Sequence, residues 1–144
     1  MTMTRDVRLI DVTLRDAHQC LWATRMTTGM MKSMAPALDN AGFEAIDLVG
    51  GAVFDVCVRY LREDPWERLH AIREKAPDVP TQMLLRGANG VGYTSYPDNV
   101  VHRFCALAHD AGMDVFRVFD SLNYLENMRL GVDAAGGPRT VVCE

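Results

Sequence analysis

Asn40–Ile46 (NAGFEAI) and Asp110–Phe116 (DAGMDVF) are the two stretches that decide the fold, because each joins the end of a helix to the start of a strand. In both, a helical pattern ends on Ala-Gly, and an apolar residue, an acid and an apolar run follow. Gly42 and Gly112 suit the position just after a helix, where the backbone is often left-handed. The return of this junction is typical of parallel βαβ units.

Strands and helices alternate in the same way along the rest of the chain. Apolar runs predict strands over residues 8–12, 43–49, 81–86 and 114–119, and the start of a fifth over 139–143. Helical patterns are predicted over residues 27–41, 54–62, 65–75, 97–111 and 122–134. Polar loops are expected over residues 13–19 and 87–96, and a turn over residues 136–138.

The first long helix and the helix from Pro65 have recognisable starts. Thr27 or Thr28 is expected to cap the first, and Asp64 the second, with Pro65 at its first position. The first helix also contains Pro36, which is expected to kink it. Its core face is predicted from helical spacing as Met26, Met30, Met34, Leu38 and Ala41.

Polar residues follow successive predicted strands where each strand ends: Asp11 with Arg15 and Asp16, then Arg86, then Asp120. In a parallel barrel all strands end at one rim, where sites are built, whereas a doubly wound sheet gathers its ligand at a switch point. The pattern therefore favours an α/β barrel. A complete barrel takes about 250 residues, so 144 residues correspond to a partial TIM barrel. That part comprises roughly the first four βα units and the start of a fifth strand, with sheet edges that favour association.

The composition excludes several classes of function. A formal net charge of -4 argues against a nucleic-acid surface, and no apolar run is long enough to span a membrane. The first residues lack the apolar core of a signal peptide, so a cytoplasmic protein is expected. Cys20, Cys57, Cys105 and Cys143 are too dispersed for a zinc site, and free buried thiols are expected.

Arg15, Asp16 and Arg86 are the side chains best suited to chemistry. A carboxylate at a barrel rim can bind a divalent metal, and a guanidinium can stabilise an enolate oxygen or hold a carboxylate. From the residues alone, a surface salt bridge between Arg15 and Asp16, or a loop cap, is the favoured interpretation of this pair. Arg86 could instead pair with Asp120 or Asp47. His18 is a possible ligand or base, although a lone loop histidine is more often structural.

Several motifs together resemble the carboxyltransferase domain of biotin-dependent enzymes, the group of pyruvate carboxylase, the oxaloacetate decarboxylase α-subunit and the transcarboxylase 5S subunit. The stretches that carry the resemblance are Asp11–Gln19 (DVTLRDAHQ), Gly50–Cys57 (GGAVFDVC), Glu63–Leu69 (EDPWERL), Gln82–Gly87 (QMLLRG) and Val115–Asn123 (VFRVFDSLN). The resemblance covers most of the chain and implies that residues 1–144 are the N-terminal half of a carboxyltransferase barrel domain.

The resemblance implies biotin-dependent carboxyl transfer to or from a small 2-oxo acid, pyruvate or oxaloacetate, through a metal-stabilised enolate. Arg15 and Gln19 then correspond to catalytic residues, Arg86 and Tyr93 to substrate-binding residues, and Asp16 to a ligand of a divalent metal (Zn, Mn or Co). Biotin is expected as carboxyl carrier on another domain or subunit. The partner is that carrier domain or the other half of the barrel, in a homo- or hetero-oligomer.

Some features depart from the family pattern. The family's carbamylated lysine, His-x-His metal pair and catalytic threonine belong to later strands, so the isolated chain is expected to be inactive. Cys20, Val49 and Ala88 replace a usual Ser, Trp and Gln, which indicates a possible change of substrate. Two alternatives stay open: a metal-dependent aldol or Claisen lyase or synthase of the hydroxymethylglutaryl-CoA lyase or isopropylmalate synthase type, and a truncated non-catalytic subunit.

Overall fold

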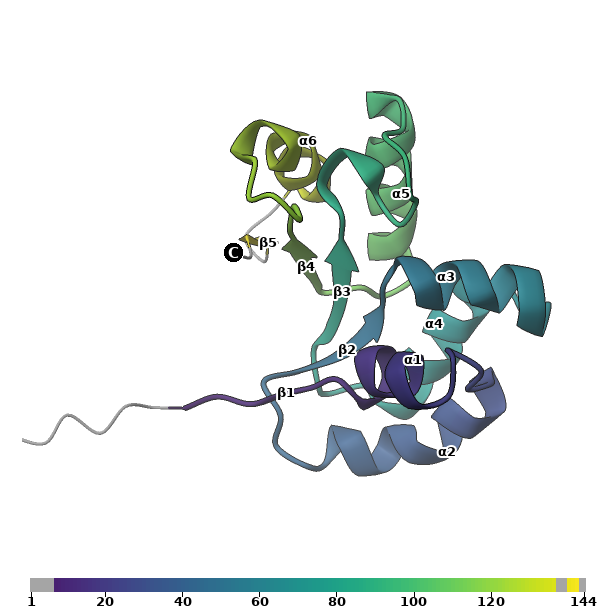
Figure 1. Cartoon of the computed structure of the whole chain (residues 1–144). Helices are drawn as coiled ribbons and strands as arrows, with labels where there is room; N and C mark the ends of the chain where they lie inside the picture. The colour runs from purple at the N-terminus through teal and green to yellow at the C-terminus, as the bar shows by residue number, and fades with distance from the viewer. Residues whose placement is uncertain (1–6, 137–139, 143–144) are drawn as a thin grey trace, which may run out of the picture.

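The structure is a computed structural model that describes residues 7–136 and 140–142 (Figure 1). Its strands are β1 Ile10–Asp11, β2 Ala45–Val49, β3 Thr81–Leu85, β4 Val115–Val118 and β5 Thr140–Val142. Its α-helices are α1 His18–Leu21, α2 Thr28–Asp39, α3 Gly51–Val56, α4 Pro65–Lys75, α5 Asp98–Asp110 and α6 Leu125–Ala135. Three short helical turns complete it: η1 Thr13–Ala17, η2 Cys57–Leu61 and η3 Gly87–Asn89.

The strands form one parallel sheet in chain order, β1-β2-β3-β4-β5 (Figure 1). The predicted alternation of strands and helices is confirmed for the described residues. Gly42 and Gly112 at the two repeated junctions have φ values of 78° and 100°, the left-handed backbone that a residue after a helix often needs. Residues 139 and 143 of the predicted fifth strand, and residues 137–138 of the predicted turn, lie outside the described residues.

The two faces of the sheet differ in chemistry because successive strand residues point to opposite sides. One face carries Ile46, Leu48, Met83, Leu85, Phe116 and Val118, all buried in the core cluster. Met31 of α2, Ile72 of α4 and Cys105 of α5 belong to the same cluster, so these helices pack on that face. The register places Asp47 beside Gln82 and Leu84 beside Arg117 on the opposite face, so charged and polar side chains of the strands lie there.

One local prediction is wrong, and a second is confirmed only in part. Residues 13–19 form helical turns and not a loop, because Val12 O accepts hydrogen bonds from the amides of Arg15, Asp16 and Ala17. Of the core face predicted for the first long helix, Met26 is buried and Met34 and Leu38 pack against the core, but Met30 and Ala41 are exposed. The fully buried residues of α2 are Met31 and Ala35. Apolar residues on several sides of this helix left its core face ambiguous.

The cysteines match the expectation of free buried thiols only in part. Cys57 and Cys105 are free and buried, but Cys20 is exposed. Burial raises the pKa of the Cys105 thiol to about 11. His102 and His109 are exposed on α5. Among the described helices, none combines the length and the apolar character that crossing a membrane demands.

Asp64 caps α4 in the predicted way: its Oδ1 accepts hydrogen bonds from the amides of Trp66 at 2.7 Å and Glu67 at 3.4 Å. Replacing Asp64 with alanine should lower the free energy of unfolding by about 1 kcal/mol, because the amides lose their partner. Denaturant unfolding measures this. Thr27→Ala, which removes a longer 3.3 Å cap bond from α2, should cost less, and the reverse order would contradict this account.

Candidate active site

Arg15 lies on η1, directly after β1, and its guanidinium is held by two carboxylates. Its Nε donates to Asp47 Oδ2 at 3.0 Å, and its Nη1 donates to Asp16 Oδ1 at 3.1 Å. The Asp47 side chain is fully buried, whereas that of Asp16 is 47% exposed. The expected Arg15–Asp16 pair therefore exists, but the buried carboxylate of Asp47 on β2 also binds the same guanidinium.

Asp47 occupies the middle of β2, on the polar face of the sheet. Burial raises the pKa of its carboxyl group, while the charge and hydrogen bond of Arg15 and the charge of Arg117 act in the opposite direction. A buried carboxylate needs such partners, because removal from water is costly for an unpaired charge. Asp47 thus fixes the direction in which the remaining N–H groups of Arg15 point.

Gly50 and Gly51 directly follow β2 and give the two arginines room to approach. A Cβ atom on Gly50 would lie 3.1 Å from Arg15 Cδ. A Cβ atom on Gly51 would lie 2.6 Å from Arg86 Nη1. Arg15, which follows β1, and Arg86, which follows β3, therefore lie against consecutive residues at the carboxyl end of the strand between them.

Arg86 is half-buried, and neither of the predicted acidic partners binds it. Its Nη1 donates to Gly92 O at 3.0 Å, and its guanidinium lies over the ring of Tyr93, 4.9 Å from the centroid. Within the described residues it has no carboxylate partner, since Asp47 binds Arg15 and Asp120 makes other bonds. Its other N–H groups are thus available to a ligand.

A cleft of about 240 Å³ adjoins Arg86. Its lining is Arg86, Asn89, Gly92, Tyr93, Phe119, Asp120, Ser121 and Asn127. The Asp120 carboxylate accepts from the amides of Leu122 and Tyr124 and from the Asn127 side chain, and these bonds lower its pKa. Because its charge is engaged in these bonds, Asp120 opposes an anion beside Arg86 less than a free carboxylate would.

The other predicted site residues occupy the same end of the sheet with fewer contacts. Gln19 is half-buried on α1, the helix that follows η1, and its side chain makes no hydrogen bond within the described residues. Tyr93 is 65% exposed at the edge of the cleft. His18 begins α1 and is therefore not a loop residue, and it is buried at 2% exposure. Burial and the positive charge of Arg68 lower its pKa.

Asp16 offers a single metal ligand. Within the residues that the structure describes, no group of three or more His, Cys, Asp or Glu side chains could hold a metal ion. Asp16 has one carboxylate oxygen bound to Arg15 and is otherwise half-exposed. One carboxylate does not make a cation site, so the described residues do not by themselves fit a catalytic metal.

Sequence reasoning missed Asp47 as the residue that fixes Arg15. The available signal was an acid in the middle of an otherwise apolar strand, Phe43–Val49, since an acid there is buried only with a partner. It also missed Asn127, which binds Asp120 from α6 at 2.6 Å. No sequence signal indicated Asn127, because the contact depends on how α6 packs beside the end of β4.

The fold and the site define a parallel α/β domain in which two arginines, one after β1 and one after β3, approach the carboxyl end of the strand between them, an arrangement suited to a small organic anion. The chain is 57% identical over 136 residues to rat mitochondrial pyruvate carboxylase, covering 93% of this chain and 12% of the rat protein. It is 50% identical over 129 residues to a pyruvate carboxylase subunit of Methanocaldococcus jannaschii, and the match covers 90% of this chain and 23% of the archaeal one. No family model matches the chain.

Solved structures agree with these relatives. The carboxyl transferase domain of Rhizobium etli pyruvate carboxylase with oxamate and biotin superposes with a TM-score of 0.88 at 51% identity. The match covers 97% of this chain and 24% of that one. The same domain with pyruvate and biocytin also gives a TM-score of 0.88. The chain belongs to the carboxyltransferase domains of biotin-dependent enzymes, and it spans a quarter or less of the length of these relatives.

Proposed function

We propose that this chain contributes the first strands of a (β/α) barrel that transfers a carboxyl group between biotin and pyruvate or oxaloacetate. The convergence of Arg15 and Arg86 on Gly50–Gly51 carries the proposal. It puts two permanently charged side chains against consecutive residues at the carboxyl ends of parallel strands, where barrel enzymes build their sites, and one of them, Arg86, lines the cleft. The Rhizobium etli structures with pyruvate and with oxamate support a small 2-oxo acid as the ligand.

The strand order supports the barrel. A doubly wound sheet reverses its order at a switch point, whereas β1 to β5 follow one another without reversal. β1 pairs with β2 alone in the described sheet, and the residues around it are exposed and apolar: Val7, Leu9, Ile10 and Val12. An unpaired apolar edge calls for a further strand. We assign residues 1–144 to the N-terminal half of the barrel, completed by another part of the protein or another subunit.

The chemistry assigned to this chain is electrostatic. The planar guanidinium of Arg86 suits the carboxylate of the 2-oxo acid, with Tyr93 at the edge of the cleft. Arg15, held by Asp47, is directed at the oxygen that becomes negative when the methyl group of pyruvate loses a proton. Gln19, on the next helix, is assigned to the centre of carboxyl transfer. Each of these groups either stabilises the enolate relative to the ketone or orients the substrate.

The metal of the family would add further positive charge beside that oxygen, with Zn, Mn or Co as candidates. Asp16 is the single ligand that this chain offers, so the remaining ligands belong to the part of the barrel beyond it. Biotin, as the carboxyl carrier, is assigned to another domain or subunit. The isolated chain is therefore assigned binding of the 2-oxo acid and not turnover.

Titration of the purified chain with oxamate, followed by amide NMR, tests the binding function. Oxamate should shift the amides of Gly50, Gly51 and Gly92, which surround the two guanidinium groups, and should leave the exposed amides of α5 in place. Oxamide, the neutral diamide of the same size and shape, serves as the control ligand. Shifts that are equal for both ligands, or that occur on α5 instead, would refute an anion site at the end of β2.

Pyruvate–oxaloacetate exchange with free biotin tests the enzymatic part. We expect no exchange by the chain alone, and exchange when it is mixed with the remaining part of the Rhizobium etli carboxyl transferase domain. That remaining part alone is the control. Exchange by the isolated chain would show that it needs no further strands. Oxamate binding without exchange in the mixture would indicate a non-catalytic subunit.

A further inference from the structure

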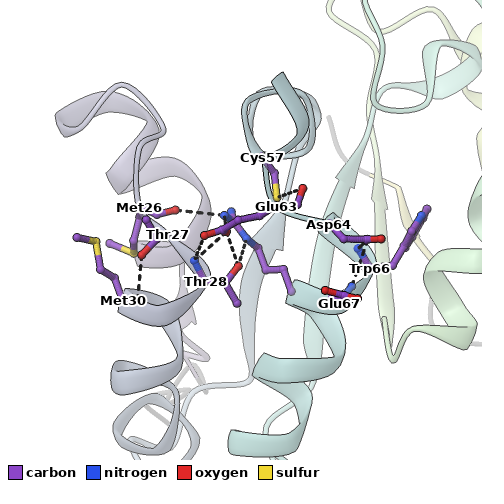
Figure 2. A network of polar contacts seen from close by, with 10 residues as sticks. Met26, Thr27, Thr28, Met30, Cys57, Glu63, Asp64, Trp66 and Glu67 are labelled. Atoms are coloured by element: carbon purple, nitrogen blue, oxygen red, sulfur yellow. Dashed lines mark hydrogen bonds and ion pairs between the residues drawn. The ribbon is translucent and has the colours of Figure 1, made fainter. Parts of the chain in front are cut away.

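A buried polar network on the outer side of the domain joins the start of α2 to α4 (Figure 2). Arg68 of α4 is 3% exposed, and its Nη2 lies 2.6 Å from Glu63 Oε2. Figure 2 shows Glu63 between the two helices, with Met26, Thr27 and Thr28 on the α2 side. None of these residues lines the cleft beside Arg86, so the proposed chemistry leaves the network without a role.

The network binds the C-terminal end of residues 22–27, the linker between α1 and α2. Arg68 Nη2 donates to Met26 O at 3.3 Å, and Arg68 Nε donates to Thr28 Oγ1 at 2.9 Å. Glu63 Oε2 accepts from the Thr28 amide at 3.0 Å and from the Thr28 hydroxyl at 2.6 Å. Although burial acts to raise it, the bonds from Thr28 and Arg68 hold the pKa of Glu63 below its usual value.

The linker itself is strained. Ala23 and Thr24 have φ values of 47° and 64°, in the left-handed region that residues other than glycine rarely occupy. Such residues persist only where the surrounding structure holds them. At the α1 end, His18 O accepts the amides of Trp22 at 3.0 Å and Thr24 at 3.0 Å. At the α2 end, Arg68 and Glu63 supply the bonds.

We propose that the Glu63–Arg68 pair is a positioning device that keeps this linker in its left-handed conformation and thereby fixes α1 and η1. This rests on the proposed function in one respect: Arg15, Asp16 and Gln19 lie on those two elements. The cause is mechanical. Only residues 22–27 separate α1 from α2. If Met26 and Thr28 were free to move, Ala23 and Thr24 could leave the left-handed conformation. The position of α1, and with it that of the turn that carries Arg15, would then no longer be fixed.

Glu63 and Arg68 are themselves held in place by contacts outside the linker. Glu63 follows Arg62, whose φ is 54°, and its amide donates to Cys57 O at 3.0 Å. Arg68 lies on the buried side of α4 together with Leu69 and Ile72. Glu63 is thus held by a backbone bond and Arg68 by its place on the buried side of α4, so both partners have anchors outside the linker that they position. A buried guanidinium contributes specific geometry more than stability, since its removal from water opposes the gain from pairing.

Hydrogen exchange of the whole chain with Arg68→Met distinguishes positioning from general stabilisation. We expect the amides of Trp22, Thr24 and Thr28 to exchange about tenfold faster or more, while those of β3 and β4 keep their protection. Glu63→Gln is the milder variant in case Arg68→Met does not fold, because the Glu63 side chain is 28% exposed and its amide replacement stays hydrated. Arg68→Lys keeps the charge without the forked geometry and should restore protection only in part.

Arg73→Met is the matched control. Arg73 also lies on α4 and also forms an ion pair, with Asp114 at 2.9 Å, but it has no bond to the linker. Unchanged linker exchange in both Arg68→Met and Glu63→Gln, or a uniform rise that includes β3, would overturn the proposal. Exchange does not depend on a ligand, so this result stands even if oxamate fails to bind. If oxamate does bind the wild-type chain, Glu63→Gln should weaken it about threefold to tenfold, and Arg73→Met should not.

Discussion

Gly51→Ala is expected to lower the free energy of unfolding by about 3 kcal/mol, because a β-carbon there has no space. That atom would lie 2.6 Å from both Arg86 Nη1 and Val91 O. The guanidinium could move aside, but the backbone carbonyl of Val91 cannot move without shifting the whole loop that follows β3. Denaturant unfolding should show a lower midpoint, and NMR should show displaced amides around Gly92.

Alanine substitutions at two other glycines serve as comparisons for Gly51→Ala. Gly29→Ala adds a β-carbon whose nearest neighbour, Thr27 Oγ1, is 3.9 Å away in α2, and should stabilise the chain by about 0.5–1 kcal/mol. Gly50→Ala should fall between the two, because the atom that it meets, Arg15 Cδ at 3.1 Å, belongs to a side chain. If Gly51→Ala lowers the free energy of unfolding no more than Gly50→Ala does, the loop after β3 can move more easily than the structure indicates. The diglycine then does not determine the position of Arg86.

The sequence predicted most of the fold because its signals were local. The glycines that end helices, the Asp64 cap and the apolar runs of β2 and β3 each depend on a few neighbouring residues. The predicted meeting of Arg15 and Arg86 required one further step, the rule that parallel strands end at a common edge. The structure confirms that the two side chains approach the same diglycine, while their roles with a substrate stay predictions.

What the sequence could not supply depends on contacts between distant segments. Asp47 holds Arg15 across 32 positions of the chain, and Arg68 reaches Met26 across 42. The left-handed residues Ala23 and Thr24 carry no glycine or asparagine signal, so their conformation follows from the bonds at both ends of the linker. The strongest departures from local rules thus lie next to the residues assigned to chemistry, where a fold commonly tolerates strain.

Arg86→Met is expected to weaken oxamate binding about a hundredfold, the second large effect. Arg86 has no carboxylate partner within the described residues, so a bound carboxylate would be its first, and charge-assisted bonds to a half-buried guanidinium are worth about 1.5–3 kcal/mol. Arg86→Lys should lose about tenfold, because an ammonium group cannot form two parallel bonds with one carboxylate. Titration calorimetry or the NMR titration gives both ratios.

The control for Arg86 has to separate the local charge from the net charge. Arg103→Met removes the same charge from an exposed position on α5 and should leave the affinity for oxamate unchanged. Arg86 also holds the loop after β3 through its bond to Gly92 O, so the amide spectrum of each variant must first show that the fold survives. With that condition met, equal losses for Arg86→Met and Arg103→Met would mean that oxamate responds to overall charge, and the anion site at the end of β2 would have to be abandoned.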